Sequence, residues 1–258
     1  TGLVAVGASA LDANTTANNN VGIGLNALGG ATTGGDNVAI GTNSLLTNST
    51  GASNVSVGTY ALNANTSSNN TAVGYAALTA NTSGSENNAF GYGALDSNTT
   101  AQNNNAFGTL ALGANTTGTR NTAMGGNTLD ANTTASDNTA VGYTALGANT
   151  TGAGNTAVGS LAGDSITTGH SNTIIGSGAD VNTGAASGQI AIGYAINCTA
   201  NNTATFGVSS NTASLGLDGS DTSWAAASSD ERYKENIETS TAGLSFVNDL
   251  RPVTYNWK

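Results

Sequence analysis

A short apolar phrase returns every seventeen residues through most of the chain, and each copy ends in glycine. The copy at residues 138–142 reads N-T-A-V-G, and the other copies keep its order of asparagine, small residue, large apolar residue and glycine. The closing glycines are Gly7, Gly24, Gly41, Gly58, Gly74, Gly91, Gly108, Gly125, Gly142, Gly159, Gly176 and Gly193, with a looser copy at Gly207. A period this regular indicates a solenoid of near-identical stacked coils.

The apolar run around each closing glycine is too short for a helix and predicts a strand of about four residues. Alternation puts the large apolar residue on one strand face, together with the Val or Thr two positions earlier, and puts the alanine and the glycine on the other. Neither face carries charge, so we expect both to be covered. The nearly bare Ala/Gly face would let another backbone approach closely. Each strand is followed by a leucine and then by N-T-T or N-T-S, a turn signal.

These patterns predict an all-β fold, a parallel β-solenoid or β-roll of 17-residue coils that ends in a short mixed C-terminal segment. Coils stacked at roughly 4.8 Å would form a rod on the order of 60 Å long, with the asparagine before each strand in an amide ladder. Burying a few apolar side chains per coil, at roughly 1.5–3 kcal/mol each, falls short of an ordering cost of about 1–2 kcal/mol per residue. We therefore expect several chains to pack together, three around one axis.

The phrase N-V-A-I-G at residues 37–41 resembles the N-S-V-A-I-G repeat of YadA-type trimeric adhesin heads. The resemblance covers residues 1–207 and implies a trimeric, left-handed parallel β-roll. The period is longer here than in those heads, so the turns between the strands must differ.

Charge is scarce, at 8% of residues with a net charge of −10, and it is unevenly spread. Residues 1–217 carry eight acids and one base, whereas residues 218–258 carry seven acids and four bases. A base-poor rod is a poor partner for nucleic acid, and no apolar run is long enough to insert in a membrane. Cys198 and His170 are each single, so we expect no intrachain disulfide, metal or cofactor.

After Gly207 the period fails, and residues 229–237 read S-D-E-R-Y-K-E-N-I, followed by L-R-P-V-T-Y-N-W at 250–257. This segment resembles the start of the intramolecular chaperone domain of phage tailspikes and tail fibres. The resemblance implies a domain that trimerises, nucleates folding of the fibre ahead of it and then cleaves itself off. It divides the chain into a repeat shaft (1–207), a connector (208–228) and the start of a truncated chaperone (229–258). In the connector, residues 215–219 predict a strand and a turn, and in the chaperone 244–250 predict a helix.

The same resemblance implies Ser229 as nucleophile, Lys234 as its base and the bond between Ser229 and Asp230 as the one cleaved. A serine needs a nearby base, and burial can lower a lysine pKa enough for that role. Attack by Ser229 on its own carbonyl would close a strained four-membered ring. Attack from a neighbouring chain, or assistance by the Asp230 carboxylate, would avoid the strain, and the sequence does not choose between them.

Together these features predict a homotrimeric phage tail fibre or adhesin shaft that attaches to a host surface, with a glycan or a protein as its receptor. We expect it on the virion, or otherwise outside the cell or on its surface, with no activity on an external substrate. A bacterial trimeric surface adhesin or extracellular fibre is the alternative. An ice-binding solenoid is a weaker hypothesis, because the threonines sit mainly in turns.

Four tyrosines that follow closing glycines could form a glycan-binding stripe or, as the favoured interpretation, a stacked ladder: Tyr75, Tyr92, Tyr143 and Tyr194.

Overall fold

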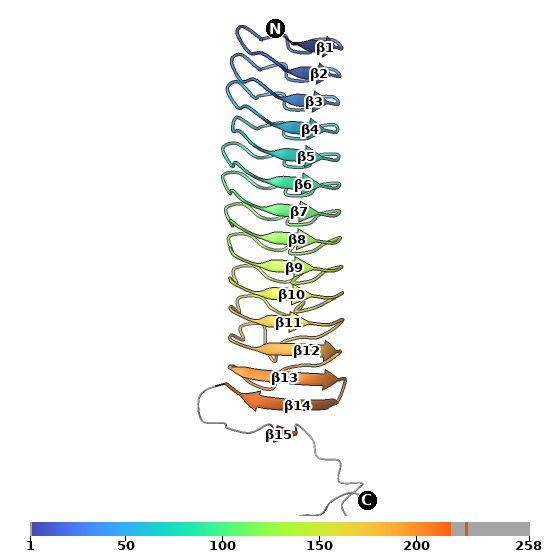
Figure 1. Cartoon of the computed structure of the whole chain (residues 1–258), viewed down its shortest axis with the longest axis vertical. Helices are drawn as coiled ribbons and strands as arrows, with labels where there is room; N and C mark the ends of the chain where they lie inside the picture. Colours follow the sequence, from blue (N-terminus) through green and yellow to red (C-terminus); the bar gives the residue numbers. More distant parts are fainter. Residues whose placement is uncertain (1, 218–224, 227–258) are drawn as a thin grey trace, which may run out of the picture. The chain divides into compact units, whose positions relative to one another are not determined.

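The computed structural model describes residues 2–217 and 225–226, in which strands are the regular secondary structure and no helix occurs (Figure 1). The chain divides into two compact units, Thr1–Ala227 and Ser228–Lys258, and every described residue belongs to the first. The strands are β1 (Val4–Val6), β2 (Val21–Ile23), β3 (Val38–Ile40), β4 (Val55–Val57), β5 (Thr71–Val73), β6 (Asn88–Phe90), β7 (Asn105–Phe107), β8 (Thr122–Met124), β9 (Thr139–Val141), β10 (Thr156–Val158), β11 (Thr173–Ile175), β12 (Ile190–Tyr194), β13 (Thr203–Val208), β14 (Asn211–Gly216) and β15 (Ala225–Ala226).

Strands β1 to β13 form one continuous parallel sheet in which each strand pairs with the next along the chain (Figure 1). Equivalent residues of successive coils stand side by side, as Ala106 does beside Ala123. The predicted parallel β-solenoid with a 17-residue repeat is thus confirmed, although most strands are three residues long, one fewer than predicted. The short step is absorbed in the turns, because Val57 still pairs with Val73.

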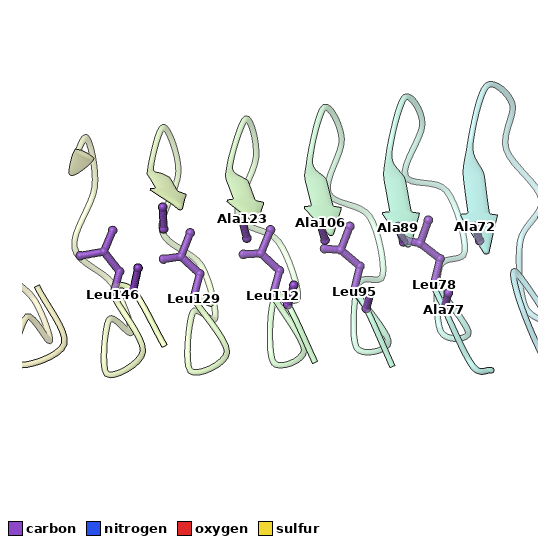
Figure 2. Close-up of a cluster of buried hydrophobic side chains, with 14 of the residues drawn as sticks. Ala72, Ala77, Leu78, Ala89, Leu95, Ala106, Leu112, Ala123, Leu129 and Leu146 are labelled. Carbon is purple, nitrogen blue, oxygen red and sulfur yellow. The ribbon is translucent and has the colours of Figure 1, made fainter. Parts of the chain in front are cut away.

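In most strands the middle residue, usually alanine, points into the coil, and this corrects the expectation that the Ala/Gly face would receive another chain. Ala89, Ala106 and Ala123 are fully buried. Each lies beside a buried leucine that the turn of the preceding coil supplies, as Ala106 does with Leu95 in Figure 2. The small side chain is needed because this leucine of the preceding turn occupies the space in front of it. The bulky strand face, by contrast, points outward.

The core leucines adopt a left-handed backbone conformation that allows the coil to close. Leu95, Leu112 and Leu129 have φ between 52° and 54°, a conformation that costs a residue with a side chain roughly 1–2 kcal/mol. Full burial of each leucine returns roughly 1.5–3 kcal/mol. Two further residues of each coil are also left-handed, such as Asn103 and Leu110. The chain therefore turns at several left-handed positions in every coil, and leucine burial offsets the cost of one of them.

The closing glycines stand where successive backbones come closest. Gly125 has φ of +138°, and a Cβ placed there would lie 2.5 Å from the carbonyl oxygen of Gly142, one coil further on. The same contact recurs between neighbouring closing glycines along the sheet. Both the backbone conformation and the contact distance exclude a side chain, which explains why glycine returns with the period of the coil.

The predicted asparagine ladder is present and lies inside the solenoid. The backbone N–H of Asn104 donates to Oδ1 of Asn87 at 3.0 Å, and Nδ2 of Asn104 donates to the carbonyl oxygen of Gly118 at 2.9 Å. This pattern recurs in successive coils, and its asparagines are buried: Asn20, Asn37, Asn54, Asn70, Asn87, Asn104, Asn121, Asn138, Asn155 and Asn172. Each amide thereby satisfies backbone groups that would otherwise be buried without partners.

A second ladder is formed by the asparagines of the N-T-T and N-T-S phrases, which the sequence pattern indicates only as turn signals. Nδ2 of Asn115 donates to Oδ1 of Asn98 at 3.1 Å and to the carbonyl oxygen of Gly118 at 3.0 Å. The ladder ends at Asn149, whose Oδ1 is buried without a hydrogen-bond partner. The residue seventeen positions further on is Ile166, which has no donor to offer.

The C-terminal end of the solenoid changes both period and direction. Ile192 pairs with Phe206, a step of fourteen residues (206 − 192), instead of seventeen. Strand β14 then folds back antiparallel onto β13, and β15 pairs antiparallel with β14 (Figure 1). Part of the segment named as a connector thus belongs to the sheet and carries its last two strands.

Gly125 and Gly126 offer a matched test of the close coil contact. Gly125→Ala should lower the free energy of unfolding by about 1–3 kcal/mol, because alanine is strained at this φ and would meet the next backbone. Gly126→Ala should have little effect, since the nearest atom to its Cβ is Cδ2 of Tyr143 at 3.7 Å. Urea unfolding followed by circular dichroism measures both. Equal midpoints for the two variants would contradict this account of the glycine period.

Candidate functional site

The residues that the sequence predicts for self-cleavage lie outside the described part of the chain. Ser229, Asp230 and Lys234 are in this position, as is the helix predicted at 244–250. The candidate sites in the described residues are therefore those on the surface of the solenoid.

Exposed apolar side chains gather on one side of the coil. We call this side the apolar face and define it as the outward residues of the strands together with the two residues after each closing glycine. In most strands the middle residue is buried, and its two neighbours are partly or fully exposed. The exposed large apolar residues of the face are Val4, Val6, Ile23, Leu25, Ile40, Val55, Tyr60, Tyr75, Tyr92, Phe107, Leu110, Met124, Tyr143, Val158, Leu161, Ile175, Tyr194, Phe206 and Val208.

Aromatic side chains on this face stack along the solenoid axis in two places. Phe90 and Phe107 are parallel, with ring centroids 4.8 Å apart. Tyr75 and Tyr92 are also stacked, at 5.4 Å, while Tyr60 meets Tyr75 edge-on at 6.0 Å. Stacked rings at about the strand spacing fit the structural ladder favoured from the sequence. Because Tyr75 and Tyr92 cover each other's faces, the shared faces are closed to a sugar ring.

The tyrosine ladder is local, however. Tyr143 has Gly126 at the equivalent position of the preceding coil and Ser160 at that of the next. Its ring instead lies close to Gly126, because a Cβ placed on Gly126 would be 3.7 Å from Cδ2 of Tyr143. Tyr143 and Tyr194 are about three-fifths exposed. The expected ladder of four tyrosines is therefore confirmed only for Tyr75 and Tyr92.

Threonines occupy two different environments. Those in the turns donate from Oγ1 to a carbonyl oxygen of the next coil, as Thr116 does to Thr133 at 3.0 Å. Most threonines of the described residues lie outside the strands, as expected, and a few stand at the first, outward position of a strand: Thr71, Thr122, Thr139, Thr156 and Thr173. The second outward position in these strands is Val, Met or Ile, so they do not form the T-x-T pattern of an ice-binding face.

Charged residues of the solenoid lie off the apolar face, in the turns. Within residues 2–217, one ion pair joins neighbouring coils, with Nε of Arg120 2.6 Å from Oδ1 of Asp137. A second hydrogen bond runs from Arg120 to Oδ2 of Asp137 at 2.9 Å. This hydrogen bonding lowers the pKa of the Asp137 carboxyl. Because both side chains are at least half exposed, the pair adds little to stability.

Three aspartates on another side of the coil have a raised pKa, the opposite of Asp137. Partial burial raises the pKa of Asp96, Asp130 and Asp164, and in Asp164 the nearby Asp180 raises it further. Asp96 and Asp130 are separated by Gly113 at the equivalent position of the intervening coil. A Cβ at that glycine would lie 3.7 Å from Oδ1 of Asp96, so the small residue leaves room for the carboxylate.

The remaining candidate side chains do not assemble into a reactive centre in the described part of the chain. His170 is exposed, and its Nδ1 lies 3.4 Å from Oγ of Ser171. Cys198 is buried, and burial raises the pKa of its thiol, which favours the unreactive protonated form. Within residues 2–217, three or more His, Cys, Asp or Glu side chains do not come together as a metal site, and no pocket opens. These residues also contain no helix that could cross a membrane.

Comparison with known proteins finds one similarity, at the C-terminal end. Residues 229–258 match the family model described as the chaperone of endosialidase. No curated protein and no solved structure matches the chain. The match supports the chaperone resemblance of this segment, which directly follows the unit that holds the β-solenoid. The likeness of residues 1–207 to YadA-type heads rests on the repeat motif alone.

Asp130→Asn should stabilise the solenoid at neutral pH. A raised pKa means that ionisation of Asp130 costs more in the folded than in the unfolded chain, so stability falls as the pH rises above the ordinary value of 3.8. The variant should therefore have a higher Tm at neutral pH, and the difference should vanish well below pH 3.8, where aspartate is protonated in both states.

Asp137→Asn is the matched control for this measurement. The pKa of Asp137 is lowered, so its stabilising effect is present above 3.8 and is lost as the pH falls. Its replacement should leave Tm unchanged or slightly lower at neutral pH. A Tm for Asp130→Asn that stays at or below that of the parent at neutral pH would contradict the assigned burial effect.

Proposed function

We propose that this chain is the shaft of a homotrimeric fibre of the phage tail fibre or tailspike kind, which attaches to a host surface. The observation that carries the proposal is the match of residues 229–258 to the chaperone of endosialidase, directly after a parallel β-solenoid. In this proposal the solenoid supplies length and receptor-binding surface, and residues 229–258 direct assembly. The fibre would act on the virion or outside the cell, with a glycan or a protein of the host surface as its receptor.

The repeat itself provides a physical reason for a dedicated assembly segment. Successive coils carry nearly the same residues at equivalent positions, so a chain shifted by one coil against its neighbour would make similar contacts. Register is weakly specified when alternative pairings are close in energy. A trimerising segment at one end would align the chains before the repeats pack, and folding would then propagate coil by coil.

In the same proposal, Oγ of Ser229, from a neighbouring chain or from the same chain with help from the Asp230 carboxylate, attacks the carbonyl carbon of residue 229. Lys234 takes the proton of the hydroxyl and passes it to the amino group of Asp230 as the C–N bond breaks. Water then hydrolyses the ester formed on Ser229. The full chain should then yield two products, residues 1–229 and 230–258. Ser229→Ala should abolish the cleavage, because the nucleophile is lost, and Lys234→Ala should slow it strongly. Intact-mass spectrometry of purified chains measures the outcome, with Ser228→Ala as the control.

Co-expression of the Ser229→Ala chain with a parent chain carrying a different tag separates the two routes to cleavage. Cleavage of the alanine chain in mixed oligomers would assign the attack to a neighbouring chain. Equal cleavage when every chain carries Ser229→Ala, or no cleavage of the parent, would exclude the serine mechanism.

The assembled Ser229→Ala chain, which should stay uncleaved, should have a mass close to three times 25.1 kDa in sedimentation equilibrium. Removing residues 229–258 should reduce the yield of trimer formed during expression, because the chains would no longer be aligned at one end.

The labelled trimer should bind whole bacterial cells of some strains in a panel and not others. A monomeric parent would contradict the fibre, whereas a trimer that binds no strain tested would contradict attachment to a bacterial host. The gene neighbourhood would distinguish a phage fibre from a bacterial adhesin.

A further inference from the structure

The apolar face is free of charge along its whole length. The charged residues among 2–217 lie in other turns of the coils: Asp12, Asp36, Glu86, Asp96, Arg120, Asp130, Asp137, Asp164 and Asp180. Within the same range, the exposed large apolar side chains outside the face are Leu3 and Leu217, which flank β1 and the end of β14. Exposed apolar surface and charge are thus separated onto different sides of the coil. An uncharged surface rich in exposed apolar side chains, on an acidic rod, is typical of a protein interface.

The periodicity of the face indicates what covers it. Equivalent side chains recur at the strand spacing of about 4.8 Å, because the coils stack through one parallel sheet. A partner that meets each of them in the same way must have the same spacing over the same length, and another copy of this chain meets that condition. A parallel, in-register copy would place the aromatic stretch around Phe90 and Phe107 beside its own equivalent.

The face is also large enough to hold chains together. Twelve steps between β1 and β13, strands about 10 Å long and a turn of two residues give on the order of 900 Å² per copy. A stable protein interface buries about 800 Å² on each partner. An interface of this area over stacked coils would supply the apolar burial that the leucine core of a single thin coil lacks.

We propose that the apolar face is the surface through which copies of this chain pack, parallel and in register, around a common axis. This inference rests on the proposed trimeric fibre and names the side of the solenoid that faces the other chains. The inward side of each strand is filled by the leucine of the preceding turn, so the bulky outward residues make the contact. The turn threonines and the aspartate side of the coil then remain on the outer surface.

Two double variants of equal charge test the assignment. Phe107→Glu with Val158→Glu places two carboxylates on the apolar face, and Thr117→Glu with Thr168→Glu places two on exposed turns of the same coils. Sedimentation velocity should show the oligomer for the parent and for the turn variant, and a threefold smaller mass for the face variant. Far-UV circular dichroism should show that all three keep their strands.

Disulfide cross-linking gives a second measurement that does not depend on the folding of the charged variant. The native Cys198 is buried and should not compete. On mild oxidation, Val158→Cys should form disulfide-linked dimers, because identical positions meet near the axis, whereas Thr168→Cys should not. A mixture of Val158→Cys and Phe107→Cys chains, three coils apart, should give links only between identical positions.

The outcomes separate this inference from the proposed function. A face variant that keeps the parent's mass, with no cross-link at residue 158, would overturn the interface and leave the trimeric fibre standing. A monomeric parent without cross-links would overturn both. Cross-links between residues 107 and 158 would contradict the in-register arrangement.

Discussion

The close stacking of one backbone on the next, at the spacing of a single strand, is the constraint on which the rest of this solenoid depends. Each closing glycine lies so near the next coil that a Cβ would meet its carbonyl oxygen, as at Gly125 and Gly142. Glycine must therefore return once per coil, and the remaining residues must fit between two such contacts. The inward strand residue is small and the turn leucine fills the interior, because a coil of this size leaves room for one large side chain at that level.

Such a thin core is supplemented by buried hydrogen bonds. The two asparagine ladders donate to backbone carbonyls inside the coil and connect each coil to its neighbours. Buried amides are costly when unpaired, so a ladder is favourable only while each rung meets the next. The second ladder shows this at its end, where Asn149 is followed by Ile166 and its Oδ1 has no partner. Stability therefore depends on uninterrupted repetition, and it is shared between neighbouring coils.

The arrangement also separates the roles of the chain's parts. The described solenoid holds its polar groups in ladders and turns, its charges away from the strands and its exposed apolar side chains on one face. These properties suit a shaft that packs against copies of itself. The chemistry implied by Ser229 and Lys234 lies in the C-terminal segment that matches a chaperone. In the proposed fibre, the repeats and the predicted cleavage residues therefore occupy separate parts of the chain.

Much of the solenoid follows from the sequence alone. Residue spacing predicts the glycine period, the strand positions, the first asparagine ladder and the loss of the repeat after Gly207. It does so because each coil needs the same residue types at equivalent positions. Spacing does not decide which strand face points inward, since alternation defines two faces without saying which is enclosed. Closure through left-handed turns such as Leu112 sends that leucine to the alanine face and leaves Phe107 outside. The second ladder and the antiparallel end at β14 are likewise tertiary, because they depend on neighbours that only a closed and stacked coil brings together.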